Sequence, residues 1–403
     1  MRRAWITLAF VMAAGGSDRA WAQSTLTLSE ALSQARERAS AVVSARLAIE
    51  ESRARLAGAE HRQANPELDV GAGNRQGDGT RSTDLDVGIA QSFEPGRRRS
   101  SRRAMAASSI DRARADLDEV TRQVLLETAS LFLRGLHLME RMRLLDRSSE
   151  LAANVLDIAD RRFRAGDVAI LDVNLARAAA ARIRAERHRE AAERASVMGE
   201  LRALLQLEGE VELQGGLPRA VDVEPSVVAE ALARRPELRA LEAAIDEAEA
   251  EHQFGRSFTR PDYGVGVRYQ REEGNHIVLG GLTLTLPLFA RGQEPTAAGL
   301  ARASRLKSEL NAARIRIGIE VHSAWNAYQS RVDAVRTLER DALPGLDEND
   351  GLAARSFEVG QIGLAELLLI RREIIDTRFH YLDAVFEAAL ARVELDARTG
   401  VLR

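Results

Sequence analysis

The chain of 403 residues contains no cysteine. This absence excludes a disulfide framework, a cysteine zinc site, an iron–sulfur cluster, a thiol nucleophile and a lipid on an N-terminal cysteine. A surplus of positive charge is also missing, because 57 basic residues face 60 acidic ones, and this argues against a nucleic-acid partner. The seven histidines are scattered without metal-ligand spacing, and no Walker loop, nucleophile elbow or Rossmann fingerprint occurs. We therefore expect no enzyme, no cofactor and no metal site.

Proline is scarce, and its nine positions are uneven. Residues 96–217 contain none and are rich in alanine, leucine, arginine and glutamate, which predicts very long helices. After the N-terminus, no stretch reaches the roughly 18 apolar residues that a transmembrane helix needs.

The N-terminus has the pattern of a secretory signal peptide. Arg2 and Arg3 precede an apolar run over 4–14, and small residues around Trp21 predict cleavage after Ala22. The alternative is an N-terminal membrane anchor, but the run is shorter than the roughly 20 residues of a typical span. We expect an exported protein that is periplasmic, secreted or inserted in an outer membrane as strands.

The chain repeats itself at about half its length. Residues 65–71 resemble 260–266, Phe93 with Gly96 resembles Phe289 with Gly292, and 162–166 resemble 356–360, at offsets of 195, 196 and 194 residues. A Gly/Pro break follows residue 214. The predicted organisation is a signal peptide (1–22), a first repeat (23–215) and a second repeat (216–403).

Each repeat has the same predicted helices. A helical segment comes first, then a long helix, a turn at a glycine and a returning helix; the ranges are 27–62, 100–163 and 169–206, then 226–257, 297–357 and 363–398. Five apolar residues recur every seven positions in the first long helix, as in a coiled coil: Leu117, Val124, Leu131, Leu138 and Leu145. Such a helix is about 95 Å long. Pro344-Gly345 should bend or break its counterpart.

Between these helices, each repeat carries two stretches that alternate apolar and polar residues. The predicted strands are 66–73 and 84–93, then 262–270 and 277–288. Ten residues with this alternation suit a strand that crosses a membrane. The alternative is two ordinary soluble hairpins packed on helices. Export favours the membrane, and four strands with an apolar face need partner strands, since they cannot close a barrel alone.

At this point the sequence resembles the TolC family of outer-membrane efflux ducts, over essentially all of the mature chain. The resemblance rests on the tandem halves, the paired strand hairpins and the two turn motifs at 162–173 and 356–367. The segments that end the two strand pairs, 91–98 and 286–292, resemble the heavy-metal-efflux, Czc-type branch of that family.

The resemblance implies a mainly α fold with a membrane β-barrel part, assembled as a homotrimer. Three chains would form a twelve-stranded β-barrel in the outer membrane of a Gram-negative bacterium and a long α-helical barrel in the periplasm. The duct would be passive. It would connect a periplasmic adaptor (membrane fusion protein) and an inner-membrane transporter to the exterior, with heavy-metal cations as cargo in the Czc-type branch. Two other hypotheses are a periplasmic coiled-coil adaptor or scaffold without a pore, and an exported hydrolase, for which no site is visible.

Three groups of candidate functional residues follow from the resemblance. The tips would contact the adaptor through Phe163, Gly166, Val168, Phe357, Gly360 and Ile362. In the family, acids just past the second tip can ring the closed pore entrance, and Glu366 matches the first such position, with Asp172 as its counterpart in the first repeat. Leu369 stands where better-known members carry a second acid, so a double ring is not expected. The alternative for Glu366, and the favoured interpretation for Asp172, is a solvated acid at a helix start.

A basic cluster follows the second predicted strand. Its members are Arg97, Arg98, Arg99, Arg102 and Arg103. Arginines at a helix N-terminus oppose the macrodipole, so we expect acidic partners for them. In the duct they would lie near lipid headgroups, whose phosphates could also bind them. The alternative is a solvated charged face.

Overall fold

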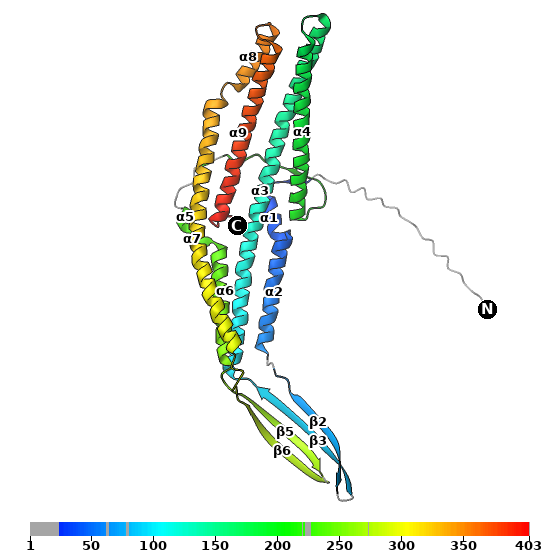
Figure 1. Ribbon diagram of the computed structural model, residues 1–403, viewed down its shortest axis with the longest axis vertical. Helices are drawn as coiled ribbons and strands as arrows, with labels where there is room; N and C mark the ends of the chain where they lie inside the picture. The colour runs from blue at the N-terminus through cyan, green and yellow to red at the C-terminus, as the bar shows by residue number, and fades with distance from the viewer. Residues whose placement is uncertain are drawn as a thin grey trace, which may run out of the picture.

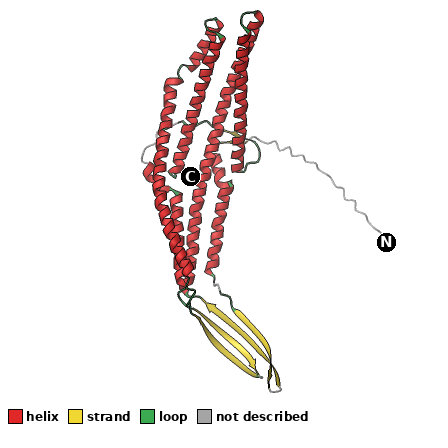
Figure 2. Ribbon diagram, viewed as in Figure 1, coloured by secondary structure: helices red, strands yellow, loops and turns green. Residues whose placement is uncertain are grey.

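The computed structural model describes residues 24–61, 64–77, 80–219, 221, 227–272 and 274–402. The predicted signal peptide therefore lies outside the described residues. The described chain is elongated: helices run along most of its length, and a small sheet projects from one end (Figures 1 and 2). The two turns between long helices lie together at the opposite end (Figure 1).

The first repeat is built on one very long helix. Helix α3 (Gly96–Ala165) runs for 70 residues without interruption, and α4 (Ile170–Leu205) returns along its upper half (Figure 1). At 1.5 Å per residue, α3 is about 105 Å long. The predicted seam is confirmed: Val124, Leu138 and Leu145 are buried, and Leu117 and Leu131 pack against the core cluster that contains Val124.

The corresponding helix of the second repeat is divided. Helix α7 (Gln293–Thr337) passes into a π-helical turn (Leu338–Ala342) and then breaks before α8 (Leu346–Glu358). The break predicted at Pro344-Gly345 is confirmed. Proline cannot donate the helical hydrogen bond, and Gly345 takes a φ of 91°, which is outside the helical region. Helix α9 (Leu364–Arg398) returns along α8 and α7.

Each predicted leading helix is two helices. In the first repeat α1 (Leu28–Arg38) and α2 (Ser40–Glu60) are separated at Ala39, whose ψ is 127°. No local breaker explains this bend; Ala39 is fully buried in the core cluster with α1. In the second repeat α5 (Val227–Arg234) and α6 (Pro236–Ser257) are separated at Arg235, because a residue before proline disfavours the helical conformation.

One four-stranded antiparallel sheet joins the repeats in the order β2-β3-β5-β6. Its strands are β2 (Glu67–Gly77), β3 (Thr80–Phe93), β5 (Asp262–Glu272) and β6 (Asn275–Thr285). The hairpins are tighter than predicted, since most of the expected loops are strand, and β6 ends three residues earlier than expected. A second, two-stranded parallel sheet pairs β1 (Ser24–Leu26) with β4 (Val211–Leu213).

The larger sheet exposes one apolar face. Large apolar side chains are exposed on one face of all four strands, among them Leu68, Val70, Ile89, Val265, Val267, Leu282 and Leu284. Burying such a face is the main source of stability for a sheet, and this chain does not bury it.

Candidate functional site at the helical tips and the strand–helix junction

The two tips share one backbone geometry. Gly166 and Gly360 take left-handed φ values of 84° and 77°. At the first tip the Asp167 N–H donates to the Arg162 carbonyl at 2.9 Å, and the second tip repeats this bond at 2.8 Å. This is the Schellman closure of a helix, in which glycine relieves the steric cost of the left-handed residue.

The side chains at the tips differ although the backbones agree. Phe163 is 39% exposed, whereas its counterpart Phe357 is 7% exposed. The guanidinium of Arg162 covers the Phe357 ring, with Cζ 5.0 Å from the ring centre. The two tips also share one apolar cluster, which includes Val173 of α4 and Leu367 of α9. Of the predicted tip residues, Phe357 lies within this cluster and Ile362 packs against it, whereas Phe163 stays exposed. Val359 of the second tip and Ile170 of the first are exposed as well.

The candidate pore acids lie one turn beyond the tips. Glu366 is exposed in the first turn of α9, and Asp172 is half-buried in the first turn of α4. Each precedes a residue of the shared apolar cluster, so the two acids occupy equivalent places on the two return helices. Leu369, one turn after Glu366, is exposed.

A groove that the sequence did not predict separates the two helical hairpins below the tips. It has a volume of 860 Å³ and is lined by α3 and α4 on one side and α9 on the other. Arginines outnumber carboxylates in its lining; they are Arg141, Arg147, Arg182, Arg189, Arg371, Arg372 and Arg378. The remaining wall is largely leucine, isoleucine and alanine. No sequence signal marks this groove, because its walls come from different repeats.

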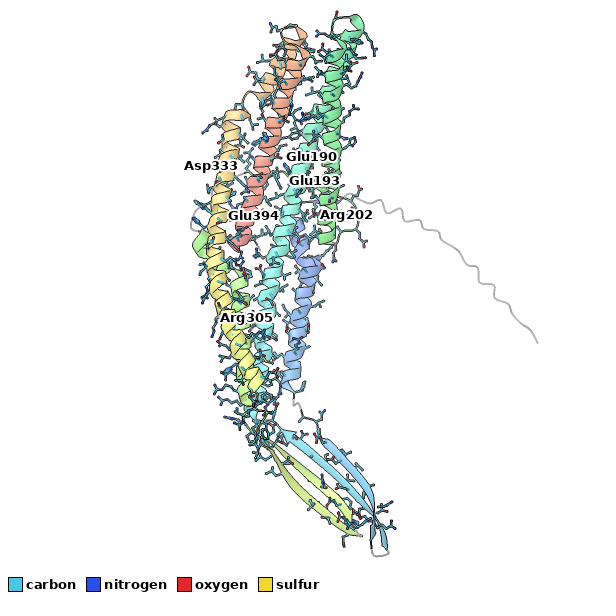
Figure 3. The ribbon with its side chains drawn as sticks, in the orientation of Figure 1. Glu190, Glu193, Arg202, Arg305, Asp333 and Glu394 are labelled. Carbon is cyan, nitrogen blue, oxygen red and sulfur yellow. The ribbon has the colours of Figure 1, made fainter. Side chains whose placement is uncertain are left out.

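A polar network, also not predicted, closes the lower end of the groove. Arg141 of α3 donates from Nη1 to Asp383 of α9 at 2.8 Å and from Nε to Glu190 of α4 at 3.0 Å. Glu190 lies where α3 and α4 run side by side (Figure 3). The His137 Nε2 is 2.8 Å from the same Asp383 oxygen. An ionised carboxylate only accepts, so His137 donates here.

The network ties the first repeat to the second. The His137 ring stacks on Phe386 at 4.6 Å, and the Arg141 guanidinium covers Phe379 at 4.2 Å. Burial raises the pKa of Asp383, but the hydrogen bonds and charges of His137 and Arg141 outweigh it and leave that pKa below its usual range. Asp383 is therefore a fixed negative charge between two helical hairpins.

The predicted basic cluster lies at the junction between sheet and helices, and its acidic partners are confirmed. Arg98 pairs with Asp262 of β5 at 2.7 Å and covers the Phe258 ring at 4.3 Å. Arg102 holds Glu94 through two hydrogen bonds of 2.6 and 2.7 Å. These charge-assisted bonds fix the angle between β3, β5 and α3.

The remaining members of the cluster are more exposed. Arg99 donates to the Glu60 carbonyl at the end of α2, and Arg103 pairs with the Glu60 carboxylate at 3.0 Å. Arg97 is exposed. Four of the five arginines thus have protein partners, and the cluster's first role is to join strands to helices.

The described residues contain neither a metal-binding cluster nor a membrane-spanning helix. No group of three or more histidine and carboxylate side chains there is arranged to hold a metal ion. No helix in the described part of the chain combines the length and apolar character of a membrane span.

A family model decides what this architecture belongs to. The model for outer membrane efflux proteins matches residues 31–209 and again residues 227–401. The chain belongs to the outer membrane efflux protein family. The double match coincides with the tandem repeat, so each repeat is one unit of the family. This family consists of channels rather than enzymes.

Relatives of this efflux protein agree with the assignment. It is 26% identical over 329 residues to the cobalt-zinc-cadmium resistance protein CzcC of Cupriavidus metallidurans, which covers 80% of this chain and 78% of CzcC. Its fold resembles a crystal structure of CusC with a TM-score of 0.79 at 16% identity, covering 93% and 92% of the two chains. A membrane protein from Pseudomonas aeruginosa matches with a TM-score of 0.78 at 19% identity, covering 93% and 90%.

Proposed function

We propose that this efflux protein is the outer-membrane exit duct of a tripartite efflux system, in which it passively conducts substrate to the exterior. One observation carries the proposal: a single chain has a sheet with an uncovered apolar face at one end and two helical tips about 105 Å of helix away (Figure 1). Such a shape suits a bridge between a membrane and a partner across an aqueous compartment. Each strand of 11 or 14 residues is long enough to cross a bilayer.

The duct would be a homotrimer in the outer membrane of a Gram-negative bacterium. The sheet has two open edges, β2 and β6, and open edges pair with further strands. Three copies with four strands each would supply the twelve-stranded barrel that the TolC resemblance implies. A scaffold without a pore is disfavoured, because it would leave the apolar face of the sheet in water.

The adaptor (membrane fusion protein) would bind at the tips, and an inner-membrane transporter would act behind it. The exposed residues Phe163 and Val359 and the half-buried Val168 offer small apolar contacts, held by the rigid turns at Gly166 and Gly360. Phe357 supports this surface from below, and half-buried Ile362 flanks it. The arginine-lined groove would extend the same surface toward acidic side chains of the adaptor.

The cargo would be divalent heavy-metal cations, supported by the name of the relative CzcC. In a trimer, Glu366 from each copy would form a ring of three carboxylates near the entrance, which attracts cations. Asp172 would lie in an equivalent place on the other return helix. Neutralising Glu366 (Glu366→Gln) should reduce cation selectivity in single-channel recordings, with Asp172→Asn as the matched change in the first repeat. Unchanged selectivity in the Glu366 variant would remove this acid from the pore entrance.

A deletion strain tests the function. Loss of the gene should sensitise cells to cobalt, zinc and cadmium, and the natural gene should restore resistance. A tip variant, Phe163→Asp, should assemble in the outer membrane but fail to restore resistance, whereas Arg305→Ala, on α7 far from the tips (Figure 3), should restore it. If deletion changed sensitivity to antibiotics alone, the metal cargo would be wrong. If deletion changed neither, the efflux role itself would be wrong.

A further inference from the structure

A second, smaller cavity, the mid-length pocket, lies where the two repeats meet and has a volume of 290 Å³. Its walls are α1 and α3 of the first repeat, the end of α5 and the start of α6 of the second, and the residues that follow α9. Figure 1 shows α1, α5 and the C-terminus near the middle of the elongated molecule. The volume is close to the lower limit of about 300 Å³ for small-molecule sites, so the pocket suits one charged group with a small substituent.

Four arginines from four helices line the mid-length pocket. They are Arg36 of α1, Arg122 of α3, Arg234 of α5 and Arg239 of α6. Asp118 of α3 is the one carboxylate among the described residues of the lining. Guanidiniums that share a concave site repel one another unless negative charge compensates them, so this composition favours an anionic ligand.

Arg122 has a fixed position and unused donors. Its Nε and Nη2 donate to the Glu119 carboxylate at 2.9 and 2.5 Å, and its side chain is 11% exposed. Its Nη1 has no hydrogen-bond partner among the described residues. Glu119 therefore holds this guanidinium in the pocket wall and leaves two N–H groups for a ligand.

Two further arginines of the pocket are weakly bound. Arg36 is half-buried in the last turn of α1 and forms no ion pair with a carboxylate of the described chain. The Nη1 of Arg239 lies 3.5 Å from the Asp118 Oδ2, and no hydrogen bond joins these two described side chains. Both arginines can therefore turn toward a ligand with little loss of existing bonds.

The start of α6 adds positive potential to the same pocket. Pro236 is the first residue of this helix, and it lines the pocket together with Arg239 one turn later. No side chain caps this N-terminus. Unpaired N–H groups and the helix dipole give such an end a partial positive charge, which favours a bound anion beside the arginines.

We propose that the mid-length pocket binds a phosphoryl group, carried by free inorganic phosphate or by a small phosphate monoester. A carboxylate is planar and offers two oxygens, whereas a phosphoryl group presents three or more oxygens in tetrahedral directions. The available donors of Arg36, Arg122 and Arg239 come from three different helices, which suits the tetrahedral group better. The bound anion would connect the two repeats at their boundary. The site is independent of the proposed duct, which would still conduct with this pocket empty.

Titration calorimetry of the full mature chain in detergent tests the proposal. The probes are inorganic phosphate and glycerol phosphate, with the ionic strength held constant by chloride, and saturable binding of one anion per chain is expected. Arg36→Gln breaks no ion pair of the described residues and should weaken binding about tenfold, because it removes a charge-assisted contact. The matched control is Arg38→Gln, an exposed arginine of the same helical turn outside the lining, which should change the affinity by less than about twofold.

A second variant should change binding in the opposite direction. Asp118→Asn removes the carboxylate that competes with the ligand for Arg239, so phosphate should bind about fivefold more tightly. Arginines that only stabilise the fold would not give opposite effects on binding at Arg36 and Asp118. Circular dichroism first establishes that each variant is folded.

The two probes and a planar anion separate the outcomes. Tighter binding of glycerol phosphate would identify a monoester as the ligand, and tighter binding of inorganic phosphate would identify the free anion; either result supports the site. Acetate should bind at least about tenfold more weakly than phosphate. Equal affinity for acetate, equal effects of Arg36→Gln and Arg38→Gln, or no saturable binding would overturn the proposal. None of these results bears on metal resistance, which the deletion strain tests separately.

Discussion

The two helical hairpins end in the same turn, yet they are built differently. The first has an unbroken outer helix of 70 residues, whereas the outer helix of the second is divided by a π-helical turn and a break at Pro344-Gly345. The short α8 that results is 13 residues long and is held to α9 by ion pairs, including Arg371 with Asp350 at 3.2 Å. The two repeats therefore share the turn at the tip but differ in the outer helix that leads to it. The first hairpin acts as a rod, and the second is a jointed arm packed on it.

The jointed arm depends on the rod for its position. Phe357 of the second tip is buried under Arg162 of the first, and Asp383 of α9 is held by His137 and Arg141 of α3. Both contacts cross between repeats. Changes at these contacts should therefore affect the second hairpin more than the first.

The largest effect is expected from separating the hairpins at the polar network. Replacing Arg141 (Arg141→Met) leaves the buried Glu190 with only the longer, 3.9 Å contact to Arg189, which should lower the free energy of unfolding by about 3 kcal/mol. The matched control Arg143→Met removes an exposed ion pair with Glu140 and should cost less than about 1 kcal/mol. Urea unfolding followed by circular dichroism measures both. Equal losses would show that the network does not join the hairpins.

The two tip phenylalanines give the next effect. Phe357→Ala opens a cavity in the shared cluster and should cost about 3 kcal/mol, whereas the half-exposed Phe163→Ala should cost about 1 kcal/mol. Protease cleavage within α8 should accelerate in the Phe357 variant alone. If Phe163→Ala were the more destabilising change, the arrangement of rod and arm would be reversed.

Replacing two glycines of the second hairpin by alanine should change the stability of the protein in opposite directions. Gly345 has a φ of 91°, so Gly345→Ala should destabilise the protein by about 1 kcal/mol. Gly351 lies within α8 with open space around it, so Gly351→Ala should stabilise that helix by about 1 kcal/mol. Melting temperatures of the two variants measure this difference. A stabilising Gly345→Ala would mean that the break is not needed.

The smallest effect on stability is expected from lowering the pH. The pKa of Asp383 is lowered in the folded protein, so its contribution to stability is complete above its ordinary pKa and is lost as the pH falls through the lowered value. The gap in stability between the natural protein and Asp383→Asn should therefore shrink between about pH 5 and about pH 3. Denaturation at both pH values measures the gap, and a constant gap would contradict an ionised Asp383.

Local signals predicted much of this fold. Three features depend only on residues within one or two helical turns, so the sequence alone reveals them. They are the spacing of seven residues from Leu117 to Leu145, the glycines at 166 and 360, and the break at Pro344. The contacts between repeats could not be predicted in this way. His137 and Asp383 are 246 residues apart, and nothing near Phe357 indicates that Arg162 covers it while Phe163 stays exposed. The bend at Ala39 likewise depends on its burial and has no local cause.

The central claim is that this efflux protein forms a continuous duct from three copies of its tandem repeat. Electron cryo-microscopy of the full mature chain in lipid nanodiscs tests it most directly. The account predicts three copies around an open axis, with twelve strands in the lipid and six helical tips at the far end. Particles with a single copy, or helical bundles without an axial lumen, would contradict it.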